Sequence, residues 1–195
     1  MKKISLVLLA GAMSVLGHAQ KTNDYGRNIF RLYPLNVFSS GNVGVGLSYE
    51  RILSSDGKFG LKIPIHWGVD EANDGYYSDD VITRSGIMIN PSVKFYPAGQ
   101  RRVTYGLGFS LFGVWANNDY YKYDNGFVRR VDGTREQMGM LLENSVQFNL
   151  SPKFNIGLEL GIGPSYINRY TENGRTYNDG ITAMGLFNFH VGYRF

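Results

Sequence analysis

Large apolar residues occupy every second position through most of this chain. In the segment 59–70 the odd positions carry Phe, Leu, Ile, Ile, Trp and Val, whereas the even positions carry Gly, Lys, Pro, His, Gly and Asp. Successive side chains of a β-strand point to opposite faces, so this pattern predicts a strand with one apolar face. The same alternation predicts seven further strands, at residues 28–38, 43–53, 87–96, 103–115, 138–150, 154–162 and 181–195. It is weakest in the first of these, where apolar residues fall on both faces.

The first residues have a different pattern. Two lysines near the start are followed by an apolar stretch over residues 4–16, and Gly-His-Ala precedes Gln20. A short positive segment, an apolar region of this length and small residues before a cleavage site are typical of a secretory signal peptide. We therefore assign residues 1–19 to a cleaved signal peptide and residues 20–195 to a single domain. A retained N-terminal anchor is the alternative.

Composition excludes several classes of protein. The chain has no cysteine, which excludes a disulfide framework, a thiolate metal site and a cysteine nucleophile. No basic run exceeds two residues, so the net charge of +4 offers no patch for the phosphates of a nucleic acid. No apolar run approaches the roughly 18–20 residues that a transmembrane helix needs. Because histidines are few and scattered, we expect neither a metal nor another cofactor.

The connections between the predicted strands alternate in length. Short connections span residues 54–58, 97–102 and 151–153. Long polar connections span residues 71–86, 117–137 and 171–180. Outer-membrane barrels have short periplasmic turns and long extracellular loops. The alternation therefore indicates a transmembrane barrel with both chain ends on the periplasmic side.

The composition of the two strand faces indicates which one meets lipid. One face is almost free of charge in seven of the strands, and the other carries mainly Gly, Ser, Asn and Thr with single charges. A soluble surface would carry many more Lys and Glu residues, and a closed sheet satisfies every backbone group in lipid. We therefore predict an all-β fold, an eight-stranded antiparallel up-and-down transmembrane β-barrel with its apolar face outward. A secreted soluble barrel or sandwich is the alternative.

The end of the chain keeps the alternation to its last residue. Aromatic or apolar side chains stand at Phe189, Val191, Tyr193 and Phe195. This ending resembles the C-terminal assembly signal of bacterial outer-membrane β-barrels. Together with the export signal and the eight strands, the chain resembles the small barrels of the OmpA transmembrane domain, OmpX and OmpW type. The resemblance implies a monomer in the cell outer membrane, inserted by the barrel assembly machinery and surrounded by outer-membrane lipid and lipopolysaccharide.

Charged residues at inward positions must share one lumen. They are Glu50, Lys62, Lys94, Glu143 and Glu159, together with Arg31 if the first strand turns it inward. Side chains fill the interior of an eight-stranded barrel, and an unpaired buried charge is costly. We therefore expect these residues to form a cluster of ion pairs.

The hairpin after residues 43–53 predicts one of these pairs. A three-residue loop over residues 55–57 places Gly57 where the left-handed backbone conformation is common. The loop then sets Glu50 opposite Lys62, both inward. We therefore predict a cross-strand ion pair between their side chains.

Inward residues near the long connections are apolar, whereas those near the short turns are polar. The apolar set consists of Met88, Phe112, Val114, Leu141, Ile167, Met184 and Leu186. Two interpretations stay open. The set forms either a packed, closed core or a pocket that opens outward and takes a small apolar ligand.

These patterns favour a structural or interaction protein with a side-chain-filled lumen and surface-exposed loops. The alternative is a binder or carrier of a small apolar ligand. A lipid-modifying enzyme is a third hypothesis, but we expect no catalytic residues, because none of the long connections contains histidine. Arg129, Arg130 and Arg135 in one long connection are candidates for contact with lipopolysaccharide phosphates.

Overall fold

The computed structural model describes residues 25–38, 42–73, 81–124, 127–172 and 174–195. The strands are β1 (Asn28–Phe38), β2 (Asn42–Ile52), β3 (Phe59–Asn73), β4 (Val81–Ile89), β5 (Ser92–Phe95), β6 (Val103–Asp124), β7 (Phe127–Asn149), β8 (Phe154–Glu172), β9 (Arg175–Asn178) and β10 (Thr182–Arg194). No helix in the described residues is long and apolar enough to cross a membrane. The predicted signal peptide lies outside the described residues, and the side chains of Arg129 and Arg130 lie outside the described part as well.

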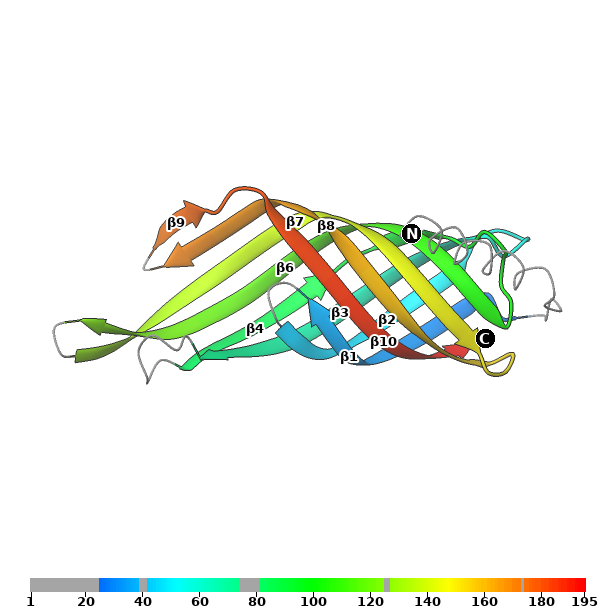
Figure 1. The fold of residues 1–195 in the computed structure, drawn as a ribbon, viewed down its shortest axis with the longest axis horizontal. Coiled ribbons are helices and arrows are strands. Elements are labelled where there is room, and N and C mark those ends of the chain that lie inside the picture. The colour runs from blue at the N-terminus through cyan, green and yellow to red at the C-terminus, as the bar shows by residue number, and fades with distance from the viewer. Residues whose placement is uncertain (1–24, 39–41, 74–80, 125–126, 173) are drawn as a thin grey trace, which may run out of the picture.

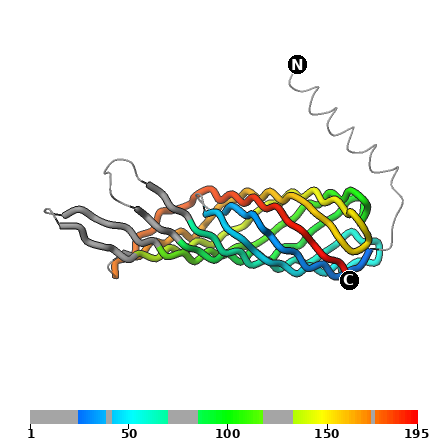
Figure 2. The backbone as a smooth tube through the Cα atoms, turned by 90° about the horizontal axis from the view of Figure 1, so that it is seen from below, coloured from blue at the N-terminus to red at the C-terminus, as the bar shows by residue number. Residues whose placement is uncertain are grey.

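The strands close into one antiparallel barrel (Figure 2). Neighbours in sequence pair with one another, and β10 pairs with both β8 and β1, which closes the sheet. β4 and β5 form a single strand of the barrel wall, since both lie between β3 and β6. Pro91 separates them because it has no N–H to donate, although its carbonyl still accepts a hydrogen bond from the N–H of Leu111. With β9 outside the closed ring, the barrel has the eight strands that the sequence predicts.

Each strand turns one face to the lumen and one face outward. In β3 the side chains of Leu61, Ile63 and Ile65 are 41–52% exposed, whereas Lys62 and His66 are fully buried. The same division holds around the barrel, where large apolar residues form most of the outer face and charged or amide side chains lie inside. The predicted fold class, with its apolar face outward, is therefore confirmed.

The strands are longer than the alternation predicts. β6 and β7 contain 22 and 23 residues, and they project beyond the rest of the barrel as one hairpin (Figure 1). The expected long connections at residues 71–86, 117–137 and 171–180 are wrong where the structure describes them, because strands β3, β4, β6, β7, β8 and β9 occupy most of their described residues. Residues 74–80, 125–126 and 173 of these connections lie outside the described residues. Every second residue is apolar only where a strand contacts lipid, whereas the backbone pairing of the strands continues beyond that contact. We call this end of the barrel the hairpin end.

A β-bulge explains the mixed pattern of β1. The pairing of β1 with both neighbours shifts around Pro34 and Leu35, and both of these residues point outward. The extra residue changes the phase, so that odd positions face the lumen before the bulge and even positions face it afterwards. Arg31 therefore points inward, as does Phe38 beyond the bulge.

A second bulge corrects one predicted lumen residue. Met138 pairs with Ile167 while the next residue, Gly139, pairs with Ser165, so Tyr166 is the extra residue. Ser165 is buried, whereas Tyr166 and Ile167 are 49% and 37% exposed on the outer face. The prediction that Ile167 lines the lumen is therefore wrong, because an uninterrupted period of two does not pass through the bulge.

Tight turns close the opposite end, which we call the turn end. Gly57 has a φ of 72°, and the hairpin sets Glu50 opposite Lys62 in the register that its loop length predicts. The Ser54 hydroxyl accepts hydrogen bonds from the N–H groups of Lys58 and Phe59 at 2.8 and 2.9 Å. The same hydroxyl, beside Asp56, holds the pKa of that carboxyl below its ordinary value.

Candidate functional site

Six charged side chains from six strands meet inside the barrel. They are Arg31 of β1, Glu50 of β2, Lys62 of β3, Lys94 of β5, Glu143 of β7 and Glu159 of β8, and each is at most 2% exposed. Every residue of the cluster predicted from the sequence is therefore in the lumen. The three acids balance the three bases, which keeps the buried cluster neutral.

The first part of this cluster is centred on Glu50. Its carboxylate pairs with the Arg31 guanidinium and accepts a hydrogen bond from the Tyr96 hydroxyl. Arg31 also donates to Oε1 of Gln147 at 2.8 Å. The predicted ion pair with Lys62 is wrong in its partner, although the register is the predicted one. Arg31 lies on the neighbouring strand β1, whose bulge hides its phase from the sequence pattern.

The second part is centred on Glu159. Its Oε2 lies 2.8 Å from Nζ of Lys62, and its Oε1 lies 2.5 Å from Nζ of Lys94. Lys62 Nζ also lies 3.0 Å from Oε2 of Glu143, whose Oε1 accepts a hydrogen bond from the Asn90 amide at 2.9 Å. These contacts connect β3, β5, β7 and β8 across the lumen. Removing one partner would leave a charge buried without compensation.

Tyr33 and Tyr96 extend the network with hydroxyl groups. The Tyr33 hydroxyl lies 2.9 Å from the hydroxyl of Ser48 and donates to Glu159 at 3.4 Å. Both tyrosines are at most 2% exposed. We did not predict their roles from the sequence. Tyr96 stands at an inward position of the alternating pattern, which could have identified it as a lumen residue. The bulge in β1 concealed the inward position of Tyr33.

A polar layer adjoins the network on the side of the hairpin end. Tyr33 packs between His66 and His190, with ring centroids 5.0 and 5.9 Å apart. The imidazole of His190 makes no hydrogen bond within the described residues, and neither do the buried amides of Asn36 and Asn188. The buried side chains of this layer are thus polar, in contrast to the apolar cluster that follows it.

An apolar cluster follows the polar layer. It consists of Phe38, Met88, Phe112, Val114, Leu141, Met184 and Leu186, each at most 4% exposed. Six of these seven residues are those predicted for the apolar part of the lumen. Phe38 was missed because the bulge in β1 turns it inward. The cluster touches the polar layer where the ring of Phe38 lies 6.4 Å from that of His66.

Side chains also fill the turn end of the lumen. Arg194 donates to Oε1 of Gln100 at 2.6 Å and to the carbonyl of Gly26 at 3.3 Å. Its guanidinium lies 5.4 Å from the centroid of the Tyr25 ring. These contacts join the last strand, a tight turn and the segment before β1. In the described residues, no group of three His, Cys, Asp or Glu side chains is placed to hold a metal ion.

The residues of the predicted assembly signal lie on the outer face of β10 and, for Phe195, directly after its end. Val191, Tyr193 and Phe195 are 39–61% exposed. The Phe195 ring lies 6.3 Å from that of Tyr193, which lies 5.3 Å from the ring of Phe154. The backbone of Phe195 exchanges hydrogen bonds with Asn28 at 3.0 and 3.1 Å. The chain end thus takes part in the seam where β10 and β1 close the barrel.

The outer face of the barrel is an apolar band bordered by aromatic residues. Tyr49, Tyr105, Phe95, Phe154 and Tyr193 lie toward the turn end, and Trp67 and Trp115 toward the hairpin end, all 36–52% exposed. Such girdles are typical of barrels that cross a membrane. An exposed apolar surface of this extent needs an apolar surrounding, which lipid supplies.

Comparison with known proteins finds solved structures that have a similar fold. No protein-family model and no curated protein matches the chain. A major outer membrane protein from Thermus thermophilus matches with a TM-score of 0.63 at 15% identity, over 86% of this chain and 99% of that one. Ail, the attachment invasion locus protein of Yersinia pestis, matches with a TM-score of 0.54 at 13% identity, over 88% and 99%. With its closed eight-stranded wall and outward apolar band, the chain has the fold of bacterial outer-membrane β-barrel proteins.

Proposed function

We propose that this chain is an integral outer-membrane barrel of structural or interaction type, with a lumen closed by side chains. The turn end faces the periplasm and the hairpin end faces the outside, as in barrels with short inner turns and tall outer hairpins. The outward apolar band supports membrane insertion, and the fold of the two neighbours supports the outer membrane as its location. The proposal includes no enzymatic step and no cofactor.

The observation that carries this proposal is the buried network of six charges. It connects strands on opposite sides of the barrel through Glu159, which pairs with Lys62 of β3 and Lys94 of β5. An ion passing through would have to break these pairs in a medium of low dielectric constant. Eight strands also enclose only enough space for side chains. The barrel is therefore a scaffold that presents its outer end, and it does not serve as a wide pore.

Hairpins β3–β4, β6–β7 and β8–β9 carry the surface that this scaffold presents. They continue beyond the barrel wall as paired strands, which hold a recognition surface more rigidly than unpaired loops would. One structural neighbour is named for attachment and invasion. We include binding to surface partners outside the cell in the proposed function, with lipopolysaccharide as a neighbour in the membrane.

A small apolar ligand in the lumen remains the alternative. It requires a continuous space among Phe112, Leu141 and Leu186. These side chains are at most 4% exposed and belong to one cluster of buried residues. Their burial favours a packed core, which is the arrangement that we propose.

Conductance in planar lipid bilayers tests the closed lumen. The folded protein, identified by its faster migration on gels before boiling, should insert without stable nanosiemens steps. The matched comparison is the variant Lys62→Ala with Glu143→Ala and Glu159→Ala, which removes most of the second part of the network and should pass more current. Large steps from the unaltered protein would contradict the proposal.

A further inference from the structure

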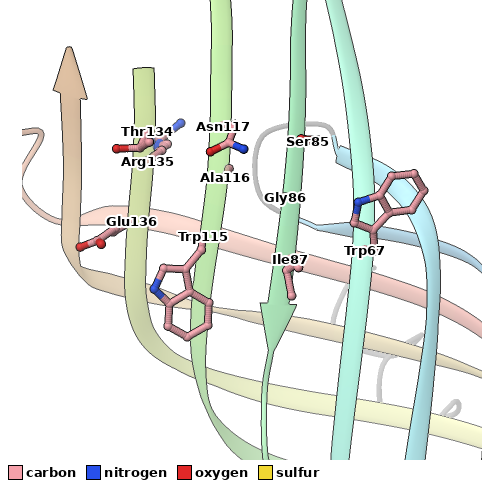
Figure 3. A pocket seen from close by; sticks show the side chains of 10 residues that line it. All are labelled: Trp67, Ser85, Gly86, Ile87, Trp115, Ala116, Asn117, Thr134, Arg135 and Glu136. Carbon is pink, nitrogen blue, oxygen red and sulfur yellow. The ribbon is translucent and has the colours of Figure 1, made fainter. Parts of the chain in front are cut away.

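A groove of about 410 Å³ lies on the outer face of the barrel near the hairpin end (Figure 3). Trp67 of β3, Ile87 of β4, Trp115 of β6 and Glu136 of β7 form one row of cross-strand neighbours along it. The indole ring of Trp115 lies over Gly113, where a Cβ atom would come within 2.6 Å of it. The ring is thereby turned toward the apolar band, which leaves space on the other side of the row.

The groove lies where the outer face changes from apolar to polar. On the side of the apolar band, the next outward residues on β3 and β4 are Ile65 and Ile89. On the side of the hairpin end, the next outward residues on β4, β6 and β7 are Ser85, Asn117 and Thr134, which line the groove. In a membrane, this boundary is the height at which lipid headgroups meet the outer ends of the acyl chains.

Three polar side chains of the groove are available to a ligand. Within the described residues, Asn117, Thr134 and Glu136 make no side-chain hydrogen bond or ion pair. Glu136 stands opposite Arg169 in the register of β7 and β8, yet the two form no salt bridge. The groove therefore offers a carboxylate, an amide and hydroxyl groups close to two exposed indole rings.

We propose that this groove binds the sugar headgroup of an outer-leaflet glycolipid. Indole rings pack against the C–H faces of a sugar ring as amphipathic walls. Ser85, Asn117, Thr134 and Glu136 provide hydrogen-bonding groups for the sugar hydroxyls, the few placed polar contacts that such a site needs. Ile87 and the residues beyond it contact the acyl chains. The site rests on the membrane orientation proposed above and goes beyond it by assigning a ligand.

The charges of the groove favour a neutral sugar over a phosphate group. Glu136 repels an anion at close range. Arg135 is the one cation among the lining residues, and its Nε donates to Oδ1 of Asn168 at 3.1 Å. Among the lining residues, a phosphate-bearing headgroup would therefore meet the Glu136 carboxylate, while Arg135 already binds Asn168. A sugar hydroxyl group, by contrast, can donate to that carboxylate.

Tryptophan fluorescence gives a direct measurement, because the two tryptophans of the chain both line this groove. The protein is reconstituted in phosphatidylcholine nanodiscs that contain increasing fractions of monoglucosyl diacylglycerol. We expect a saturable change in emission. The diacylglycerol without sugar and phosphatidylethanolamine with the same acyl chains should produce no saturable change. An equal response to all three lipids, or a stronger one to phosphatidylethanolamine, would overturn the proposal.

Two variants test the polar contacts. Glu136→Gln combined with Thr134→Val should weaken the response to the glucosyl lipid about tenfold, the effect of losing one to two hydrogen bonds. Arg169→Gln is the matched control, since it changes an exposed charge next to Glu136 outside the groove, and it should bind as the unaltered protein does. Equal binding by all three proteins would refute the assignment.

A gel-mobility measurement separates this inference from the proposed function. Each nanodisc sample is checked for the faster migration of the folded barrel before the titration. Failure to insert would overturn the outer-membrane proposal and the groove with it. Insertion without a preference for the sugar lipid would overturn the groove alone.

Discussion

Glycines in this barrel lie opposite large side chains of the lumen. A Cβ at Gly46 would lie 2.6 Å from Nδ1 of His66, and one at Gly106 would lie 2.7 Å from Cε1 of Tyr96. Each of these rings lies across the backbone of a neighbouring strand, in space that any other residue would occupy. The high glycine content of the sequence, 25 residues, thus allows the large lumen side chains to fit within a narrow barrel.

A substitution at Gly157 tests this packing. Its Cβ would come within 2.6 Å of both the His190 ring and the carbonyl oxygen of Val146. We expect Gly157→Ala to lower the free energy of unfolding by about 1–3 kcal/mol through overpacking. At the control position, Gly185, a Cβ meets nothing within 4 Å, and the same change should cost less than about 0.5 kcal/mol. Urea unfolding in lipid vesicles measures both, and equal losses would argue against the packing role.

The pair between Arg31 and Glu50 provides a second prediction for single residues. Arg31→Met leaves the Glu50 carboxylate buried without its cation and should cost about 3–5 kcal/mol. Glu50→Gln should also destabilise the barrel, because it leaves Arg31 without its anion. The double variant removes both charges and should be less destabilised than either single variant. Additive losses in the same unfolding assay would show that the two residues are not coupled.

At the scale of the strands, the two bulges limit what a repeating pattern can predict. In β1 the alternation is regular on each side of Pro34–Leu35, and in β8 it is regular on each side of Tyr166. At each bulge, however, the inward positions change from odd to even or from even to odd. A bulge is stabilised by pairing with neighbouring strands. The position of a bulge can therefore be identified only when the pairing with those strands is known. For this reason the sequence could not show that Phe38 faces the lumen and Ile167 the outside.

The closing strand provides a prediction for assembly. Phe195 lies at the seam between β10 and β1, with its backbone bonded to Asn28 and its ring beside that of Tyr193. We expect Phe195→Ser to lower the folded, heat-modifiable fraction in the outer membrane. Phe59→Ser is the matched control, because it removes a similarly exposed aromatic ring at the turn end, 48% against 61%, away from the seam. Equal fractions for both variants would remove the special role of the chain end.

At the scale of the whole molecule, the orientation in the membrane is open to a direct test. The chain has no cysteine, so a single introduced thiol gives an unambiguous label. Arg175→Cys places it on the exposed strand β9 at the hairpin end, and Ser55→Cys places it in an exposed tight turn. A membrane-impermeant maleimide should label the first in intact cells and the second only after permeabilisation. The reverse pattern would invert the proposed topology.

The sequence by itself determined the class of fold, the outward direction of the apolar face and five of the six charges of the lumen. These depend on a local period of two, which each strand shows without reference to its neighbours. The tertiary structure alone decided which charges pair. Arg31 binds Glu50 from the next strand and Gln147 from a strand 116 residues away. It also decided how far the hairpins extend and that two tryptophans flank one groove. These features arise from strand stagger and barrel closure, which bring distant residues together.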